Sequence, residues 1–357
     1  MKSILLNSGI CLAMGVVFSF SFISCDDWTE VESLEIHTPS LEEQNPQLYA
    51  DYLKDLNAYK ASDHHIALVS FDNVANPTKQ ADRLNAMPDS LDYIILNNPS
   101  EVGSELLKDM DDVRKKGTKL GYTLSYSLFE EEWKAMIEEN PELAESDRQA
   151  YFAKRTEEML ALFDTYGYDG IIVDYVGRSL VSLKDEAKRT YIARQKSFFD
   201  AITEWKSTHA DKFLAFYGNV QYVFSENMGF LKNCNFVIVR TELSTNANDL
   251  DVKIQLAEEA GKEVVEMYDG VNPVPLDNMI ACVKMPIKDD KDKNVGYWGT
   301  VEGEDKLLAA VGAASWLWKP ATTYTRRGLF IMNVTGDYYS DSYSFLKNVI
   351  NTMNPNK

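Results

Sequence analysis

The fold is decided by residues 166–178, which read Tyr-Gly-Tyr-Asp-Gly-Ile-Ile-Val-Asp-Tyr-Val-Gly-Arg. Within them, residues 170–176 form an apolar run of strand length that only Asp174 interrupts. A lone acid near the C-terminal end of an apolar strand is typical of a buried parallel barrel strand, where the acid faces the open mouth. Helical patterns precede and follow this run, so the sequence predicts a strand between two helices.

Seven further apolar runs alternate with helical patterns along the chain. Together with the first run they predict strands at residues 66–71, 91–96, 119–125, 170–176, 213–219, 236–241, 263–268 and 328–334. Eight such units are the number that closes an α/β barrel, so we expect a single-domain (β/α)8 TIM barrel over residues 45–357. An open doubly wound sheet would need a Gly-rich phosphate turn after the first strand, and residues 71–74, Phe-Asp-Asn-Val, do not provide one. Residues 272–300 are interpreted as an inserted loop or hairpin on the mouth side.

The stretch around the fourth predicted strand resembles the signature of the chitinase-like family 18 glycoside hydrolases, Asp-Gly-x-Asp-x-Asp-x-Glu. Asp169, Gly170 and Asp174 match its first Asp, its Gly and its last Asp. Ile172 stands at the middle Asp, and Val176 stands at the catalytic Glu. The resemblance therefore implies the (β/α)8 scaffold but not the family's catalytic pair.

In family 18 the substrate's own 2-acetamido group is the nucleophile, the Glu protonates the leaving oxygen and the middle Asp orients the acetamido group. Val176 cannot donate a proton, and Ile172 cannot accept a hydrogen bond from the acetamido N–H. The family also usually ends its eighth strand with a Trp under the cleaved sugar, whereas residues 329–333 read Leu-Phe-Ile-Met-Asn. The resemblance thus predicts no catalytic residue for the family's route.

A barrel mouth without a catalytic pair can still bind sugar, because aromatic rings carry the apolar faces of sugars and polar side chains satisfy the hydroxyls. Core packing is the alternative for each aromatic residue, and Asp174 fits a buried structural acid equally well. At or just beyond the predicted strand ends, the predicted glycan-binding residues are Asp174, Tyr175, Tyr217, Asn219, Arg240, Glu242, Tyr268, Asp269 and Trp298.

Residues 1–24 have the pattern of a lipoprotein signal peptide. Lys2 is followed by an apolar run that ends in a small residue before Cys25, the expected lipidation site. The run is short for a transmembrane anchor and lacks a basic flank. Residues 26–27, Asp-Asp, resemble the acidic export tag of surface-exposed lipoproteins in glycan-foraging Gram-negative bacteria. We predict a tether over residues 25–44 and a lipid-anchored, surface-exposed position on the outer membrane.

The charge balance limits the kinds of partner that the chain can bind. The chain has 36 Lys and Arg against 55 Asp and Glu, a net charge of −19, which argues against nucleic acid and against membrane contact other than through the lipid. Its four His and four Cys show no metal-binding spacing, so no metal or cofactor is expected. Cys234 and Cys282 either pair or stay as buried free thiols.

The sequence supports two functional hypotheses, one for a binding protein and one for an enzyme. The first is a non-catalytic surface protein that binds N-acetylglucosamine-containing glycans, such as N-glycans, for an outer-membrane glycan-import complex. The second is an active endo-β-N-acetylglucosaminidase with a relocated acid, for which the candidates are Asp72, Glu242, Glu266 and Asp269. A weaker third idea is a scaffold that binds a protein partner through residues 272–300.

Overall fold

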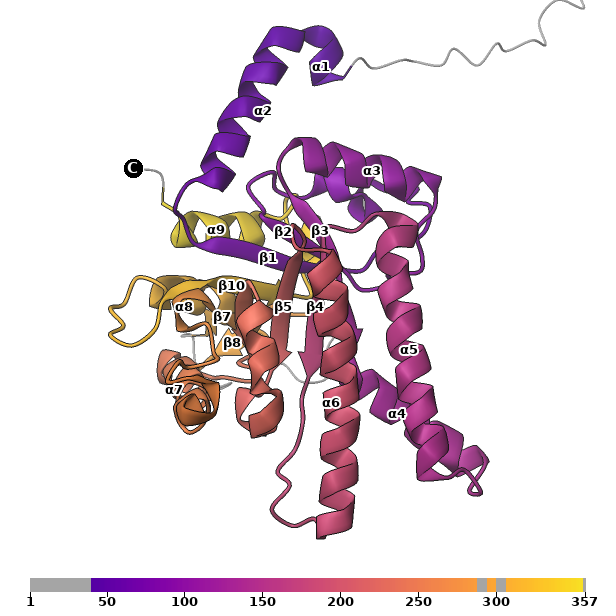
Figure 1. Cartoon of the computed structure of the whole chain (residues 1–357). Helices are drawn as coiled ribbons and strands as arrows, with labels where there is room; N and C mark the ends of the chain where they lie inside the picture. Colours follow the sequence, from indigo (N-terminus) through magenta and orange to yellow (C-terminus); the bar gives the residue numbers. More distant parts are fainter. Residues whose placement is uncertain (1–39, 288–293, 300–305, 356–357) are drawn as a thin grey trace, which may run out of the picture. The chain divides into compact units, whose positions relative to one another are not determined.

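Eight parallel strands form a closed barrel in the order β1-β10-β7-β6-β5-β4-β3-β2 (Figure 1). The computed structural model describes residues 40–287, 294–299 and 306–355. The barrel strands are β1 (Ile66–Phe71), β2 (Tyr93–Leu96), β3 (Lys119–Ser125), β4 (Gly170–Tyr175), β5 (Phe213–Gly218), β6 (Phe236–Val239), β7 (Met279–Lys284) and β10 (Arg326–Met332). The (β/α)8 barrel expected from the alternating pattern is confirmed.

The helices occupy most connections between the strands. They are α1 (Leu41–Gln44), α2 (Pro46–Ala61), α3 (Ser104–Lys115), α4 (Tyr126–Glu139), α5 (Glu145–Tyr166), α6 (Asp185–Thr208), α7 (Ala247–Lys262), α8 (Ala309–Trp316) and α9 (Ser344–Met353). Between β1 and β2 stand the 3₁₀ helices η1 (Gln80–Asp82) and η2 (Leu84–Ala86); the others are η3 (Val220–Tyr222), η4 (Ser225–Asn233), η5 (Val265–Tyr268), η6 (Leu276–Asn278) and η7 (Thr335–Tyr339). Residues 49–357 form one compact unit, and the chain before residue 49 is assigned to another.

Each barrel strand is apolar because it is buried on both faces. One set of side chains fills the barrel interior, and the alternate set packs outward against the helices. The interior core contains Leu68, Ile95, Ile172, Phe213, Ala215, Tyr217, Phe236, Ile238, Ile280, Cys282 and Phe330. This alternation decides which residue of each strand end faces the mouth.

The seventh strand was predicted in the wrong place. Residues 265–268 form the 3₁₀ helix η5, and the seventh barrel strand is β7. A strand between β6 and β10 must be buried on both sides, and the run Met-Ile-Ala-Cys-Val meets that requirement. The earlier run carries Glu266, which is exposed. The interpretation of residues 272–300 as an insertion is therefore wrong for residues 279–284; part of the remainder forms β8 (Tyr297–Trp298), which pairs with β9 (Leu307–Leu308).

Cys234 and Cys282 are both buried free thiols, which excludes the disulfide alternative. Cys25 and most of the predicted tether lie outside the described residues. In the described ranges, no helix combines the length and apolar character needed to span a bilayer.

The signature glycine Gly170 is required by the narrow barrel interior. A Cβ atom at this position would lie 2.2 Å from the Phe213 carbonyl oxygen and 2.4 Å from the Phe213 ring. The same ring would meet a Cβ on Gly121 at 2.4 Å. The side chain of Phe213 thus fills the space that both glycines leave open.

We expect Gly170→Ala to lower the free energy of unfolding by about 1–3 kcal/mol, because the added methyl group overpacks the interior. Denaturant unfolding followed by circular dichroism measures the change. Gly336→Ala is the matched control, since a Cβ there meets nothing within 4 Å and should shift stability by less than about 0.5 kcal/mol. Equal stability of the two variants would contradict this account of the barrel interior.

Candidate functional site

The site is built around the C-terminal end of β4. Because side chains alternate along a strand, Ile172, Asp174 and Val176 share the interior face. Ile172 is fully buried in the interior core, Asp174 is nearly buried above it, and Val176 is half-buried at the rim. The two signature positions that carry aliphatic residues therefore stand in line with Asp174, one below it and one above.

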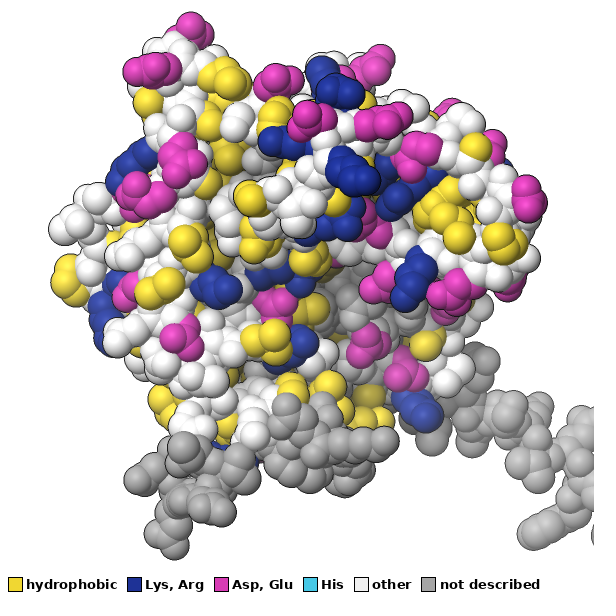
Figure 2. All heavy atoms as spheres, turned by 90° about the horizontal axis from the view of Figure 1, so that it is seen from below, with side chains coloured by type: hydrophobic (Ala, Val, Ile, Leu, Met, Phe, Trp, Pro, Cys, Tyr) yellow, Lys and Arg dark blue, Asp and Glu magenta, His cyan; other side chains and the backbone are white. Residues whose placement is uncertain are grey.

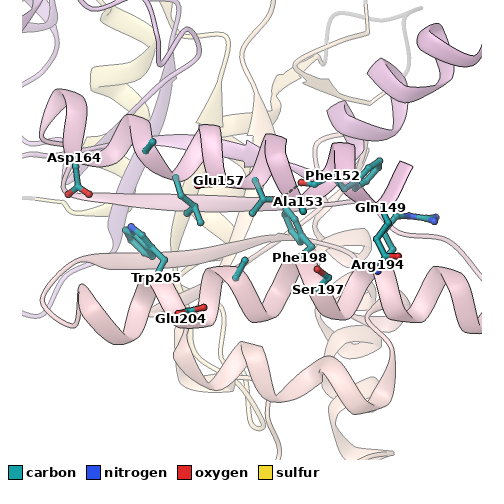
Figure 3. A pocket seen from close by; sticks show the side chains of 14 residues that line it. Gln149, Phe152, Ala153, Glu157, Asp164, Arg194, Ser197, Phe198, Glu204 and Trp205 are labelled. Carbon is teal, nitrogen blue, oxygen red and sulfur yellow. Dashed lines mark hydrogen bonds between the residues drawn. The ribbon is translucent and has the colours of Figure 1, made fainter. Parts of the chain in front are cut away.

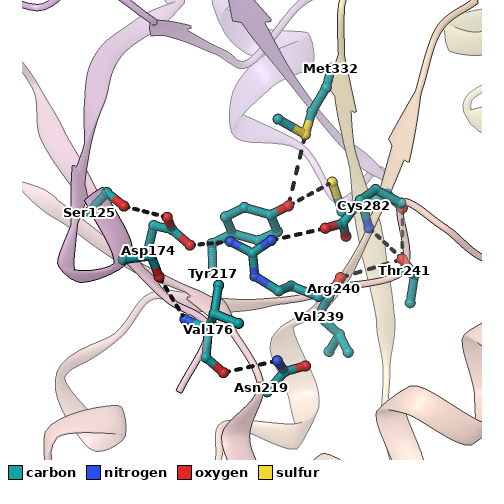
Figure 4. A network of polar contacts seen from close by, with 12 residues as sticks. Ser125, Asp174, Val176, Tyr217, Asn219, Val239, Arg240, Thr241, Cys282 and Met332 are labelled. Carbon is teal, nitrogen blue, oxygen red and sulfur yellow. Dashed lines mark hydrogen bonds and ion pairs between the residues drawn. The ribbon is translucent and has the colours of Figure 1, made fainter. Parts of the chain in front are cut away.

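Arg240, the residue after β6, joins two carboxylates at the mouth (Figure 4). Its Nη2 donates to Asp174 Oδ1, and its Nη1 donates to Glu242 Oε1 at 2.9 Å. Ser125, at the end of β3, donates through Oγ to Asp174 Oδ2 at 2.6 Å. The ends of four neighbouring strands, β3 to β6, thus contribute to one cluster, which we call the mouth cluster (Ser125, Asp174, Tyr217, Arg240 and Glu242).

The two carboxylates of the mouth cluster stabilise the charged form of Arg240. Burial alone would lower the pKa of the Arg240 guanidinium, but Asp174 and Glu242 outweigh that effect and raise the pKa above its ordinary value. Two atoms of the cluster, Arg240 Nε and Glu242 Oε2, are buried without a hydrogen-bond partner within the protein. Buried polar atoms are normally satisfied, so these two are candidates for ligand contact.

Tyr217 forms the floor of the mouth cluster. The Arg240 guanidinium carbon lies 4.2 Å from the centroid of its ring, a distance at which cation–π attraction is favourable. Its hydroxyl donates to Met332 Sδ at 3.9 Å and accepts from Cys282 Sγ at 3.8 Å. Burial raises the pKa of Tyr217 well above its usual range. The ring face toward the mouth is therefore occupied by arginine, and Tyr217 supports Arg240.

A cavity of about 430 Å³ opens beside the mouth cluster, between the ends of β4, β5 and β6 and the helix α7. We call it the mouth cavity. Asn219 fixes one wall, because its Nδ2 donates to the Val176 carbonyl oxygen at 2.9 Å. The lining residues are Val176, Asn219, Arg240, Glu242, Leu243, Ser244, Asp249, Val252 and Lys253.

The structure brings together five of the nine residues predicted from the sequence to bind glycan: Asp174, Tyr217, Asn219, Arg240 and Glu242. Sequence reasoning missed Ser125 and the part of the wall that α7 supplies. Ser125 lies directly across from Asp174 in the strand register, a pairing that only the barrel reveals. The contribution of α7 follows from how that helix packs beside β6, for which the sequence has no signal.

Tyr175 does not reach the mouth. It is fully buried on the outer face of β4, and its hydroxyl lies 2.9 Å from the Tyr191 hydroxyl and accepts from Gln195 Nε2 at 2.5 Å. Both partners belong to α6. The expectation of a mouth position was wrong because Tyr175 is one residue out of step with Asp174, and strand alternation points it to the helix layer.

Tyr268 and Asp269 do not follow a barrel strand, so the reason for predicting them was wrong. The Tyr268 hydroxyl donates to the Ser225 carbonyl oxygen at 2.6 Å and accepts from the Gly229 amide at 2.8 Å, both in η4. Asp269 is an exposed residue that ends η5 in a left-handed conformation. Trp298, in β8, is buried and packs against Gly312 of α8.

A second cavity of about 520 Å³ lies between α5 and α6 on the outer helix layer (Figure 3). Phe152 and Phe198 project into it from the two helices, with Trp205 toward one end. No barrel strand contributes to its lining, so it does not share the position in which barrel proteins keep their sites. Within the described ranges, no three His, Cys, Asp or Glu side chains gather in a way that could hold a metal ion.

The fold and the site together define a class of protein: a (β/α)8 barrel with its cavity at the carboxyl ends of the strands. Residues 29–352 match the family described as glycoside hydrolase family 18, BT1044-like. This match covers most of the chain, and the protein belongs to that family.

Solved structures share the fold at low sequence identity. The selenomethionine form of BT1044 has 13% identity and a TM-score of 0.57, over 89% of this chain and 96% of that one. An endo-β-N-acetylglucosaminidase from Cordyceps militaris has 15% identity and a TM-score of 0.54, over 85% and 95%. A family 18 chitinase from Pseudoalteromonas aurantia has 11% identity and a TM-score of 0.50, over 80% and 99%. A search of curated proteins found no match.

We expect Arg240→Met to destabilise the protein by about 3 kcal/mol, because Asp174 and Glu242 would lose the cation that joins them. Denaturant unfolding at neutral pH measures the change. Arg240→Lys, which keeps the charge, should be less destabilising than Arg240→Met. An equal loss in both variants would show that the charge of Arg240 does not account for the effect.

Proposed function

We propose that this chain binds N-acetylglucosamine-containing glycans, such as N-glycans, in the mouth cavity and does not hydrolyse them. Membership of a family 18 group supports a glycan ligand, as does the likeness of the barrel to an endo-β-N-acetylglucosaminidase. The observation that carries the non-catalytic part is Val176, which stands at the acid's place in the signature and lines the cavity.

The chemistry of the mouth cavity suits a sugar. Asn219, Arg240 and Glu242 offer donors and acceptors for hydroxyl and acetamido groups, while Leu243 and Val252 are exposed apolar side chains that can contact sugar C–H faces. The free Arg240 Nε and Glu242 Oε2 atoms would gain partners from such a ligand.

The family's route of hydrolysis lacks both of its protein groups here. A general acid typically contributes about 10²–10⁴-fold in rate, and a valine contributes none of it. Ile172 is buried below Asp174 and offers the acetamido group no hydrogen bond. A glycan bound at this mouth would therefore not be hydrolysed by the family's route.

A second function deserves a test because one acid shares the cavity with Val176. Glu242 lines the mouth cavity, and its Oε2 atom has no partner within the protein. As a relocated acid it would make the chain an active endo-β-N-acetylglucosaminidase. Its ion pair with Arg240 weighs against this role, because that pair uses the ionised carboxylate whereas a general acid must carry a proton.

Calorimetry with a panel of high-mannose and complex N-glycans and chitin oligomers tests binding. We expect at least one member to bind the wild-type chain, and Val176→Trp to abolish that binding by filling the mouth cavity. Val181→Trp is the control, because Val181 lies in the same β4–α6 connection but is 93% exposed and outside the cavity. If no member of the panel binds the wild-type chain, or if both variants bind equally well, the result would count against the proposal.

Incubation with an N-glycosylated protein, followed by mass spectrometry, separates binding from hydrolysis. We expect no released glycan from the wild type. Release that disappears in Glu242→Gln, a substitution that keeps the shape of the side chain, would instead establish the endo-β-N-acetylglucosaminidase alternative.

We also propose that the chain is a lipoprotein anchored to the outer membrane through Cys25 and exposed at the surface, where it serves a glycan-import complex. The basis is the sequence pattern of residues 1–27. We expect wild type to incorporate radiolabelled palmitate and to fractionate with membranes, and Cys25→Ala to do neither. Protease treatment of intact cells should degrade the wild-type protein. Unlabelled, freely soluble wild type would refute the anchor.

A further inference from the structure

A third cavity differs from the others in its charge. It has a volume of about 350 Å³ and lies near the first turns of α5 and α6. We call it the basic pocket; its charged lining consists of Arg148, Arg178, Lys184, Arg194, Glu145 and Glu186. Four cations against two acids is an unusual balance in a chain in which acids outnumber Lys and Arg by 55 to 36.

The acids of this region do not neutralise all four cations. Glu145 pairs with Arg194 and approaches Arg148 at 3.9 Å, and Arg148 also lies 3.5 Å from Glu130. Arg178 and Lys184 form no ion pair with any carboxylate of the described chain. Two positive charges therefore remain available to a ligand.

The arginines are held in position for an anion. The guanidinium carbon of Arg178 lies 5.0 Å from the centroid of the Tyr191 ring, and that of Arg194 lies 5.4 Å from the same ring. The Arg178 guanidinium can donate two parallel hydrogen bonds to a carboxylate or a sulfate. Arg194 already donates through Nε to the Tyr126 hydroxyl and through Nη1 to Glu145, so it contributes mainly its charge. Lys184 is the N-cap of α6 and does not cap it through its side chain, so the positive end of the helix dipole adds to the pocket.

Arg148 lies close to the like charge of Arg194. Burial and the neighbouring Arg194 lower the pKa of its guanidinium, and its Nε atom is buried without a partner within the protein. A bound anion would relieve the repulsion between the two arginines.

The basic pocket adjoins the mouth cavity along the chain. Val176 lines the mouth cavity, and Arg178 lines the basic pocket. Between them Gly177 adopts a φ of +63°, and a Cβ atom there would lie 2.5 Å from the Tyr175 ring. The Cα atoms of Val176 and Arg178 are two residues apart and so lie at most about 7 Å from each other, which brings one lining residue of each cavity close together. Figure 2 shows the face toward which β4 and β5 point, where Lys and Arg side chains lie among acidic ones.

We infer that the basic pocket binds an anionic substituent, a carboxylate or a sulfate, of the glycan held in the mouth cavity. This inference rests on the proposed function, and it specifies acidic glycans as the preferred class. Arg178 and Lys184 supply the attraction, and Arg148 and Arg194 supply the surrounding positive field. Glu186 opposes binding, because its carboxylate lines the same pocket.

Calorimetry at low salt with matched probes tests the inference. The pairs are a biantennary N-glycan with and without terminal sialic acids, and N-acetyllactosamine with and without a 6-sulfate. We expect at least one acidic probe to bind wild type about tenfold more tightly than its neutral partner. The sialylated and sulfated pairs identify which anion the pocket takes. The preference should fall as salt rises, since screening weakens charge attraction.

Three variants test whether the preference for acidic probes comes from the basic pocket. Arg178→Gln combined with Lys184→Gln should make the acidic and neutral probes bind equally, with the neutral affinity unchanged. Lys188→Gln combined with Arg189→Gln removes the same charge from α6 outside the pocket and should keep the preference. Glu186→Gln should strengthen it.

Equal binding of each pair by wild type, or a preference that survives Arg178→Gln with Lys184→Gln, would overturn the inference. Sialyllactose and N-acetylglucosamine 6-sulfate alone separate the two proposals. If either binds and is lost in that double variant while all neutral glycans stay silent, the mouth proposal fails and the basic pocket stands.

Discussion

One guanidinium holds the mouth of this barrel together. Arg240 contacts Asp174 and Glu242 and lies on the ring of Tyr217, so it joins the ends of β4, β5 and β6 through charge and packing at once. Two carboxylates this close would repel each other without the cation, and the cation would be poorly solvated without them. The wall of the mouth cavity and the orientation of its polar groups depend on this arrangement.

The mouth cluster gives Asp174 a role that the signature alone does not indicate. The two alternatives from the sequence were a ligand contact and a buried structural acid, and the structure places both of its oxygens in hydrogen bonds, one from Ser125 and one from Arg240. Asp174 is therefore primarily an anchor for Arg240. The cluster's buried polar atoms without a partner belong to Arg240 and Glu242, which follow β6, two strands along the barrel from β4. The signature strand β4 thus contributes support through Asp174, whereas the unpartnered polar groups lie beyond the end of β6.

Sequence patterns predicted seven of the eight strands close to where they lie, because a strand buried on both faces must be apolar for its whole length. They failed at the seventh, where two apolar runs competed and only closure of the barrel selects residues 279–284. Most predictions of site residues succeeded or failed together with the strand that each residue was thought to end. Asp174, Asn219 and Arg240, predicted from their positions at strand ends, do lie together at the mouth, whereas Tyr268 and Asp269 were predicted from the wrong seventh strand. Tyr175 was misplaced although alternation with Asp174 points it outward.

The sequence by itself determined the barrel, the loss of the acid and orienting positions at Val176 and Ile172, and the excess of negative charge, because these depend on local patterns and on residue identity. Tertiary structure alone decided that Ser125 and Arg240 converge on Asp174, that α7 walls the mouth cavity, and that four cations gather beside α5 and α6. Ser125, Asp174, Arg240 and α7 are distant in the chain and meet only when the strands close into a ring. Arg148 joins the other three cations only when α5 packs beside α6, so no pattern of nearby residues predicts these neighbours.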